Sequence, residues 1–389
     1  MSGAVTPLER FAAQGELYEP EREYSERVYW IWLAELLGPA CPNAGAVLAA
    51  YGSARAVYDA RLQPDRFAQA AGMAAAQRMA EEAVLPQECE KILEECNRTG
   101  VLVVTYADEE YPQQLRQLPD PPLVLYCTGQ LQWLNAGGTV GMVGSRQPSA
   151  YGVEAAAFLG DGLAKGGAVI VSGLADGLDS EGHKAAVANN APTVAVMGVP
   201  IDRTYPAANR ALRHKIEQNG VVISEYAPGQ GIGPNGFLQR NRIIAALSRV
   251  LVVVEARKRS GTMSTVEHAR RYGRAVYAVP GSIFSTLSEG TNELLCTGAA
   301  KPVTEPQPLL EVLGLAQPAP QRTPRKKAAD SRLTGPAAAV LAQMGAKPVG
   351  LSALVQQTGL PMGQLLSALT ELELAGWITA LPGRQYLLK

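Results

Sequence analysis

The chain has 389 residues, of which 47% are apolar and 18% are charged, and its net charge is −1. This composition is typical of a soluble globular protein, and the length predicts two or three domains. Its five cysteines are scattered and form no CxxC pair, which argues against a disulfide framework or a zinc site, and no apolar run reaches the ~20 residues of a membrane span. Because the acidic N-terminus has no signal-peptide pattern, we expect a cytoplasmic protein. We also expect that it holds no metal and no cofactor.

Charge is unevenly distributed along the chain. Residues 1–110 contain 9 Lys or Arg against 18 Asp or Glu, whereas Phe237–Arg274 contains nine basic residues against two acidic ones. Such a local excess of positive charge is typical of a surface that binds nucleic acid, and the net charge of the whole chain hides it.

The first hundred residues favour helices. From Tyr24 to Ala60 the apolar residues recur at spacings of three and four, and a further helical stretch runs to about Cys96. Gly38, Pro39 and Gly52 interrupt the pattern. We therefore predict a small all-α domain over residues 1–100.

Short apolar runs rich in β-branched residues begin at Val101. They are VLVVTY, LVLYCTG, TVGMVG, AVIVSG, TVAVMG, GVVISEY, RVLVVVEA and RAVYAVPG, with helical patterns between most of them. This alternation predicts an α/β fold over residues 101–316: a doubly wound, Rossmann-like parallel sheet covered by helices on both faces.

The C-terminal part of the chain predicts a linker and a third domain. Residues 317–330 are proline-rich and basic, which is typical of a flexible linker. Residues 331–389 contain helical patterns at 336–344, 351–358 and 362–375, followed by a hairpin that turns at Pro382-Gly383. Three helices and a hairpin predict a winged-helix domain.

Ligands of a doubly wound sheet bind beyond the carboxyl ends of its strands, so the residues that follow the strands are candidate site residues. After TVGMV come Gly144, Ser145 and Arg146, where N–H groups and a guanidinium suit a phosphate at a helix start. Ser172 and Gly173 fit a second anion cradle. The alternative for each turn is an ordinary surface turn.

Lys184 lies on the helix after the second cradle and is either a phosphate contact or a solvated side chain. Farther along, Phe237, Arg240, Asn241 and Arg242 place an aromatic ring beside two arginines. Single-stranded nucleic acid needs this combination, because bases stack on rings and cations hold phosphates. The alternative is that Phe237 packs in the core and the arginines face solvent.

The strongest phosphate signal is a helix start with three basic residues and two hydroxyls. It consists of Arg257, Lys258, Arg259, Ser260, Gly261 and Thr262. One mononucleotide needs one or two such turns, whereas several around one rim suit a chain of phosphates.

Together these motifs resemble the DNA-processing protein A family, also called DprA or Smf. The resemblance covers about Asp108 to Ala300 and rests on GSR, SGLADGLDSEGHKAAV, YPAANRAL, ISEYAPG, FLQRNRIIAALS, VLVVVEA, SGTMSTVEHA and RAVYAVPG. It implies a Rossmann-like domain that binds single-stranded DNA without sequence preference, forms a homodimer and loads RecA in natural transformation, with single-strand-binding protein as a further candidate partner. It also implies an N-terminal SAM-like domain and a C-terminal winged helix. The positions that resemble the family's strand-binding residues are Arg146, Lys184, Phe237, Arg240, Asn241 and Arg242.

Two other functions compete with this interpretation. Ser260-Gly261-Thr262 followed by Glu267 is similar to the GGxGTxxE motif of lysine-decarboxylase-like phosphoribohydrolases, and Glu267 would then be the catalytic residue of an enzyme that cleaves nucleoside monophosphates. Alternatively, the winged helix is the main DNA reader, although its groove-entering helix, MGQLLSALTELELA, contains no Lys or Arg to neutralise phosphates. We favour strand binding by the central domain and predict no catalytic residue.

Overall fold

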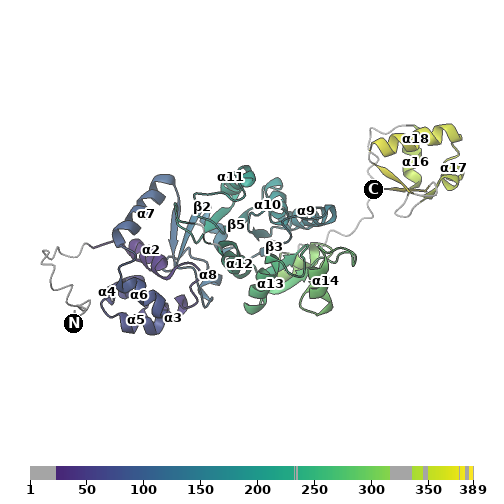
Figure 1. Ribbon diagram of the computed structural model, residues 1–389. Helices are drawn as coiled ribbons and strands as arrows, with labels where there is room; N and C mark the ends of the chain where they lie inside the picture. The colour runs from purple at the N-terminus through teal and green to yellow at the C-terminus, as the bar shows by residue number, and fades with distance from the viewer. Residues whose placement is uncertain are drawn as a thin grey trace, which may run out of the picture. The chain divides into compact units, whose positions relative to one another are not determined.

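The computed structural model describes residues 23–315 and 335–388, apart from residues 232, 234, 345–348, 376 and 382–384. The chain divides into two compact units, residues 1–317 and 318–389, and each is described by itself (Figure 1). The predicted linker at 317–330 and the predicted turn at Pro382-Gly383 fall outside the described residues.

Helices precede the sheet, as predicted for the first hundred residues. Their bounds are α2 (Glu26–Leu37), α3 (Ala44–Tyr51), α4 (Ala54–Asp59), α5 (Pro64–Ala71), α6 (Met73–Ala80) and α7 (Pro86–Thr99). The apolar residues of α2 are buried, and the same hydrophobic core continues into sheet residues such as Tyr126 and Met197. The helical region predicted as a domain of its own therefore packs directly on the sheet.

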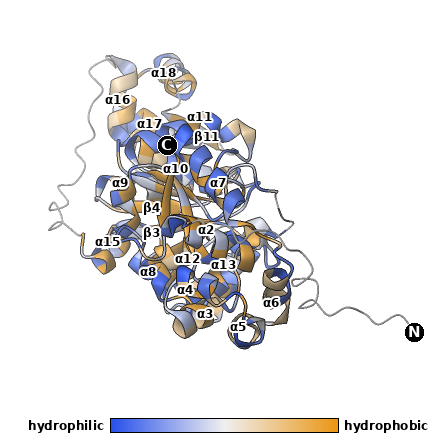
Figure 2. Ribbon diagram, turned by 90° about the vertical axis from the view of Figure 1, so that its left-hand side faces the viewer, coloured by the Kyte–Doolittle hydropathy of each residue, from blue (hydrophilic) through white to orange (hydrophobic). Residues whose placement is uncertain are grey.

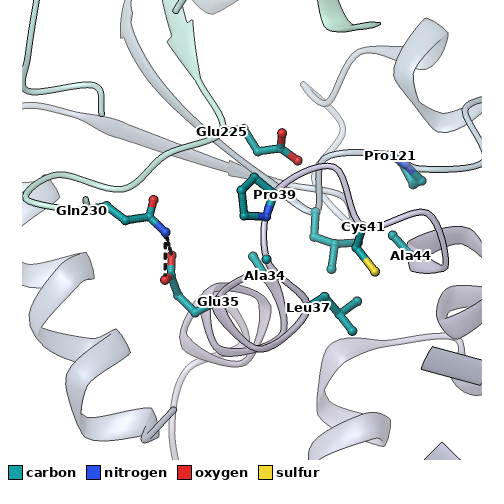
Figure 3. A pocket seen from close by; sticks show the side chains of 11 residues that line it. Ala34, Glu35, Leu37, Pro39, Cys41, Ala44, Pro121, Glu225 and Gln230 are labelled. Atoms are coloured by element: carbon teal, nitrogen blue, oxygen red, sulfur yellow. Dashed lines mark hydrogen bonds between the residues drawn. The ribbon is translucent and has the colours of Figure 1, made fainter. Parts of the chain in front are cut away.

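Polar contacts also hold the helical region against the sheet. The Gln230 amide donates to the Glu35 carboxylate, 3.1 Å from Oε2, and the Ala40 N–H donates to Glu225 Oε1 at 3.3 Å. Figure 3 shows these side chains around a cavity that also includes Cys41. Its volume of about 10 Å³ leaves room for no more than one water molecule, so it is not a ligand site.

A nine-stranded sheet with the order β1-β2-β6-β5-β4-β3-β7-β8-β9 forms the centre of the first unit. Its strands are β1 (Leu102–Thr105), β2 (Val124–Gly129), β3 (Thr139–Val143), β4 (Val169–Ser172), β5 (Thr193–Met197), β6 (Val221–Ser224), β7 (Val250–Val253), β8 (Ala275–Ala278) and β9 (Lys301–Pro302). Each of the eight predicted runs forms a strand.

The strands β3 to β9 are parallel, whereas β1 pairs antiparallel with β2, and β2 pairs antiparallel with β6. The prediction of a parallel sheet is therefore confirmed for six of the eight runs. Of the other two, β2 runs in the opposite direction, and β1 points the same way as the parallel strands but pairs antiparallel with β2. A parallel pair needs a crossover connection, usually a helix of some length. Between β1 and β2 lies only the four-residue α8 (Gln113–Arg116), which is too short to supply one.

Helices cover both faces of the parallel strands, as a doubly wound sheet requires. They are α9 (Ala150–Lys165), α10 (Leu178–Ala188), α11 (Arg210–Asn219), α12 (Gly236–Leu247), α13 (Gly261–Arg271), α14 (Glu289–Cys296) and α15 (Gln307–Leu313). Adjacent strand residues point to opposite faces. Met142 accordingly packs in one core with residues of α9, α10 and α15, and Val143 packs in another with residues of α12, α13 and α14. Figure 2 shows the apolar colour of β3 and β4 between these layers.

The second unit is a small α/β domain with its own core. It contains α16 (Pro336–Gln343), α17 (Leu351–Thr358) and α18 (Met362–Leu374), and a sheet of β10 (Val349–Gly350), β12 (Gln385–Leu388) and β11 (Ile378–Leu381). The three helices and the antiparallel β11–β12 pair agree with the predicted winged helix. In neither unit does any described helix combine the length and the apolar composition needed to cross a bilayer.

Candidate functional site

A cavity of about 460 Å³ lies at the carboxyl ends of β3, β4 and β7. Its lining residues are Val143, Gly144, Ser145, Arg146, Ala175, Asp179, Phe237, Leu238, Arg240, Asn241, Ile244, Arg257, Ser260, Gly261, Thr262 and Thr265. The fold thus brings the GSR turn, the FLQRN segment and the start of α13 together at one rim, as the position of these motifs after the strands predicts. Figure 1 shows α12 and α13 beside β3.

An aromatic and cationic stack forms one wall of this site. The guanidinium carbon of Arg146 lies 5.0 Å from the ring centroid of Phe237, and the ring of Tyr205 lies 5.1 Å from the same centroid at an angle of 44°. Arg146 is exposed, Phe237 is half-buried and Tyr205 is 50% exposed. Phe237 is therefore neither a core residue nor a free surface ring: it is held on two sides and still lines the cavity.

Tyr205 is absent from the set of residues predicted from sequence. It lies in the loop after β5, between Met197 and α11, and so at the same carboxyl edge of the sheet as the other site loops. The rule that ligands bind beyond the strand ends applies to this loop as well. An exposed tyrosine in such a loop is the signal that would have identified it.

Arg240 lines the cavity and is only 3% exposed. Its guanidinium donates to the carbonyl of Val196, while Nε has no hydrogen-bond partner among the described residues. Burial lowers the pKa of Arg240 to about 10, and the nearby Asp179 carboxylate opposes that shift, so the side chain stays charged near neutral pH. Arg240 and Asp179 both line the cavity, so the carboxylate offsets part of the positive charge that an anionic ligand would meet there.

The second predicted cradle, Ser172 and Gly173, is occupied by the protein itself. The Gly173 N–H donates to Asp179 Oδ2 at 3.1 Å, and Ser172 Oγ donates to the carbonyl of Met142 at 2.6 Å. Neither Ser172 nor Gly173 lines the cavity, whereas Asp179 does, and burial raises the pKa of the Asp179 carboxyl group. A Cβ at position 173 would collide with the Arg240 guanidinium, so the glycine provides room for that side chain.

The start of α9, where the GSR turn predicts a bound phosphate, is also satisfied internally. Glu255, 1% exposed, accepts hydrogen bonds from the Ser149 N–H at 3.0 Å and from Ser149 Oγ at 2.6 Å. The Ser145 N–H donates to the carbonyl of Glu255 at 2.9 Å. A carboxylate of the chain thus takes the place that an anion would occupy at this helix N-terminus. Gly144, Ser145 and Arg146 still line the cavity, but Arg146 is the part that can reach a ligand.

Among the described residues, no carboxylate is bonded to the start of α13 as Glu255 is to the start of α9. Ser260 precedes the helix without a side-chain capping bond, and its buried Oγ has no partner among the described residues. The neighbouring groups are fixed: Thr262 Oγ1 donates to the Gly144 carbonyl at 3.1 Å, and the Asn241 amide donates to the Gly261 carbonyl at 3.1 Å. A helix N-terminus with an unpaired hydroxyl at the edge of a cavity is suited to a phosphate.

Exposed cations continue from this helix start. Arg257 lines the cavity, and Lys258 and Arg259 are exposed next to it, outside the lining. Lys258 Nζ lies 2.8 Å from Glu293 Oε1 of α14. We call Arg257, Lys258 and Arg259 the basic ridge.

Two further predicted site residues, Lys184 and Arg242, lie outside the cavity lining. Lys184 is exposed on α10 and pairs with Glu181 at 2.8 Å. Arg242 is 1% exposed, with Nη2 2.7 Å from Glu225 and Nε 3.2 Å from Asp120. Residues two positions apart on a helix do not share a face, so Arg240 and Arg242 cannot both point into the cavity. The expectation that Arg242 faces a DNA groove does not agree with this burial.

The geometry gives no support to the phosphoribohydrolase alternative. Glu267, its proposed catalytic residue, is exposed on α13 and does not line the cavity. His183 is fully buried with Nδ1 2.8 Å from Thr193 Oγ1, and burial lowers its pKa to about 3. Within the described ranges, no group of three His, Cys, Asp or Glu residues is arranged to hold a metal ion.

Comparisons with known proteins agree with this architecture. Residues 102–314 match the family model of DNA recombination-mediator protein A, and residues 323–384 match the DprA winged helix domain. Protein Smf of Synechocystis sp. is 32% identical over 328 residues, which cover 76% of this chain and 82% of that protein. DNA processing protein DprA of Streptococcus pneumoniae is 42% identical over 203 residues, covering 52% of this chain and 71% of that protein.

Solved structures of similar proteins give the same result. The crystal structure of DNA processing protein A from S. pneumoniae covers 75% of this chain and 98% of its own, with a TM-score of 0.64 and 34% identity. A structure that addresses the single-stranded DNA binding mode of DNA processing protein A from Helicobacter pylori covers 54% of this chain and 95% of its own, with a TM-score of 0.50 and 34% identity. With its sheet, its strand-end cavity and its winged helix, this chain belongs to the DNA recombination-mediator protein A family, DprA/Smf.

Proposed function

We propose that the cavity and the basic ridge bind single-stranded DNA without sequence preference and without changing it chemically. The observation that carries this proposal is the stack of Arg146, Phe237 and Tyr205 at the wall of a cavity that a buried arginine also lines. A base can stack against the rings, while phosphates are held by Arg146, by the start of α13 and by the basic ridge.

Selectivity for a single strand follows from where the rings lie. Phe237 is half-buried and lines a cavity, so a base reaches it only when it is unpaired and turned out of a stack. The groups around it are mainly cations, a hydroxyl and N–H groups, which bind phosphates of any sequence. The structure from H. pylori supports the proposal, since it addresses single-stranded DNA binding by a relative of this chain.

We further propose that the bound strand is passed to RecA, that the protein acts as a cytoplasmic homodimer, and that single-strand-binding protein is a further partner. The support is the family's description as a recombination mediator, a role that requires delivery of a strand to a recombinase.

Anisotropy titrations of labelled oligothymidylate and of a duplex of equal length test the strand-binding proposal. Affinity for the single strand should fall linearly in a log–log plot against salt, with a slope of about −0.7 per neutralised phosphate. Phe237→Ala should cost roughly 1–3 kcal/mol with little change in slope, since no charge is lost. Equal affinity for duplex and single strand, or an unchanged affinity of a folded Phe237→Ala variant, would contradict the proposal.

A further inference from the structure

The loop between β8 and α14, residues 279–288, exposes two large apolar side chains. Ile283 is 82% exposed and Phe284 is 93% exposed, the highest value among the large apolar residues of the described chain. The loop is nevertheless held in place: the Gly281 N–H and carbonyl bond the Asn292 side chain at 3.2 and 3.1 Å, and the Phe284 N–H donates to Ser282 Oγ at 3.2 Å. Because these bonds hold the loop, fraying does not explain why its two apolar side chains are exposed.

This loop lies next to the basic ridge. In the sheet β7 lies between β3 and β8, and all three strands are parallel, so the loops that follow them meet at one edge. The Gly290 N–H donates to the carbonyl of Ala256 at 2.8 Å, directly before the ridge, and Tyr151 Oη donates to the carbonyl of Pro280 at 2.6 Å. At about 4.8 Å per strand, the loops after β3 and β8 are separated by roughly 10 Å.

We infer that Phe284 is a second base-stacking platform, and that single-stranded DNA leaves the cavity across the basic ridge to reach it. The inference rests on the proposed function and extends it by a second contact site on the same strand. Strand-binding surfaces combine a cationic path with successive rings, and the order here is Phe237, basic ridge, Phe284.

A protein partner fits this surface less well. A stable protein interface covers about 800 Å² on each partner, far more than two side chains supply. One exposed ring, by contrast, is sufficient for one base. The neighbours of Phe284 along the loop are the apolar Ile283 and the hydroxyls of Ser282 and Ser285. The Lys258–Glu293 pair joins the basic ridge to α14, the helix that follows the loop.

The test uses the full-length protein and oligothymidylates of increasing length. Oligomers that fill only the cavity should bind wild type and Phe284→Ala equally. Longer oligomers should bind Phe284→Ala at least about 5-fold more weakly, which corresponds to the loss of one stacked base. Phe284→Trp should retain the affinity, and its tryptophan emission should change when long oligomers are added but not when short ones are. Phe158→Ala, which removes another exposed ring from α9, outside the cavity lining, is the matched control and should behave as wild type.

Phe284→Leu separates stacking from apolar packing. Leucine keeps an apolar contact but offers no ring, so stacking predicts weak binding of long oligomers by this variant. If Phe284→Leu binds like wild type, or if Phe284→Ala changes the oligomeric state in light scattering without a length-dependent loss, the inference is overturned and the loop is a protein contact. Failure of Phe237→Ala to weaken short oligomers would overturn the proposed function instead, so the two failures are distinguishable.

Discussion

Arg146 and Arg242 carry the same charge and lie in opposite environments. Arg146 is exposed beside Phe237, whereas Arg242 is buried between Glu225 and Asp120. Exposure determines which of them can neutralise a phosphate, because a buried and paired guanidinium cannot reach a ligand. Sequence places both next to strand-binding motifs and cannot separate them.

Arg146→Ala should weaken binding of single-stranded DNA uniformly across sequences and lower the salt slope by about one phosphate. It should leave the free energy of unfolding nearly unchanged, because the residue is exposed. Anisotropy titrations at several salt concentrations, together with urea unfolding, measure both quantities. An unchanged slope would mean that Arg146 orients the Phe237 ring without holding a phosphate.

Arg242→Ala should show the reverse pattern. Removing it leaves the partly buried carboxylates of Glu225 and Asp120 without their cation, and breaking a buried ion pair typically costs about 3–5 kcal/mol of stability. At low temperature, the molecules of this variant that remain folded should bind single-stranded DNA with the wild-type salt slope. If Arg242→Ala unfolds at the wild-type urea midpoint but shows a smaller salt slope in DNA binding, Arg242 contacts the bound strand.

His183 should make the fold sensitive to acid. Its pKa is lowered by burial to about 3, against about 6.5 when unfolded, so the unfolded state binds more protons between these values. The stability that the neutral ring contributes is present above pH 6.5 and is lost progressively as the pH falls toward 3; each pKa unit corresponds to about 1.4 kcal/mol. Urea unfolding at several pH values should show a shallower decline for His183→Gln than for wild type. Parallel declines would assign the acid sensitivity to other groups.

At the scale of elements, two helix N-termini face the same rim and differ in whether side chains of the protein already form hydrogen bonds there. Ser149 and Glu255 fill the start of α9, whereas the start of α13 has an unpaired Ser260 hydroxyl. Ser260→Ala should therefore weaken strand binding without loss of stability. Ser149→Ala should cost about 1 kcal/mol of stability, the usual effect of removing a cap, and leave strand binding unchanged in the folded protein. Both variants are tested by their affinity for single-stranded DNA and by thermal unfolding. If they lower the affinity equally, the start of α13 is not the helix N-terminus that binds the phosphate.

The same elements show how far sequence reasoning extends. Apolar runs predicted the strands, and their carboxyl ends predicted the rim, because both depend on local pattern and on a general rule of parallel sheets. The carboxylate that fills the first predicted cradle could not be predicted from local sequence. Glu255 lies 106 positions from Ser149, and nothing in either segment indicates that they meet. The reversed direction of β2 was missed because an apolar run carries no information on the direction of its neighbour.

At the scale of the whole molecule, the two units differ in which of their helices carry cations. Helix α18 of the second unit contains Glu371 and Glu373 but no Lys or Arg, whereas α12 and α13 of the first unit and the loop between β7 and α13 contain several arginines. Helix α18 instead exposes apolar side chains, with Leu374 85% exposed. A helix without cations is poorly suited to neutralise the phosphates that border a duplex groove. The lack of cations on α18 favours strand binding by the first unit.

A chain that ends at residue 330, and so lacks the winged helix, should therefore bind oligothymidylate with the affinity and salt slope of the full-length protein. The cavity, the basic ridge and the aromatic stack all lie within residues 1–317 and share their cores with that unit alone. Ending at 330 retains the basic segment around Arg325, so that charge is not removed together with the domain. Arg146→Ala introduced into the shortened chain should reduce the salt slope as it does in the full chain. If the shortened chain is folded by circular dichroism but loses most of its affinity, the winged helix contributes directly to strand binding.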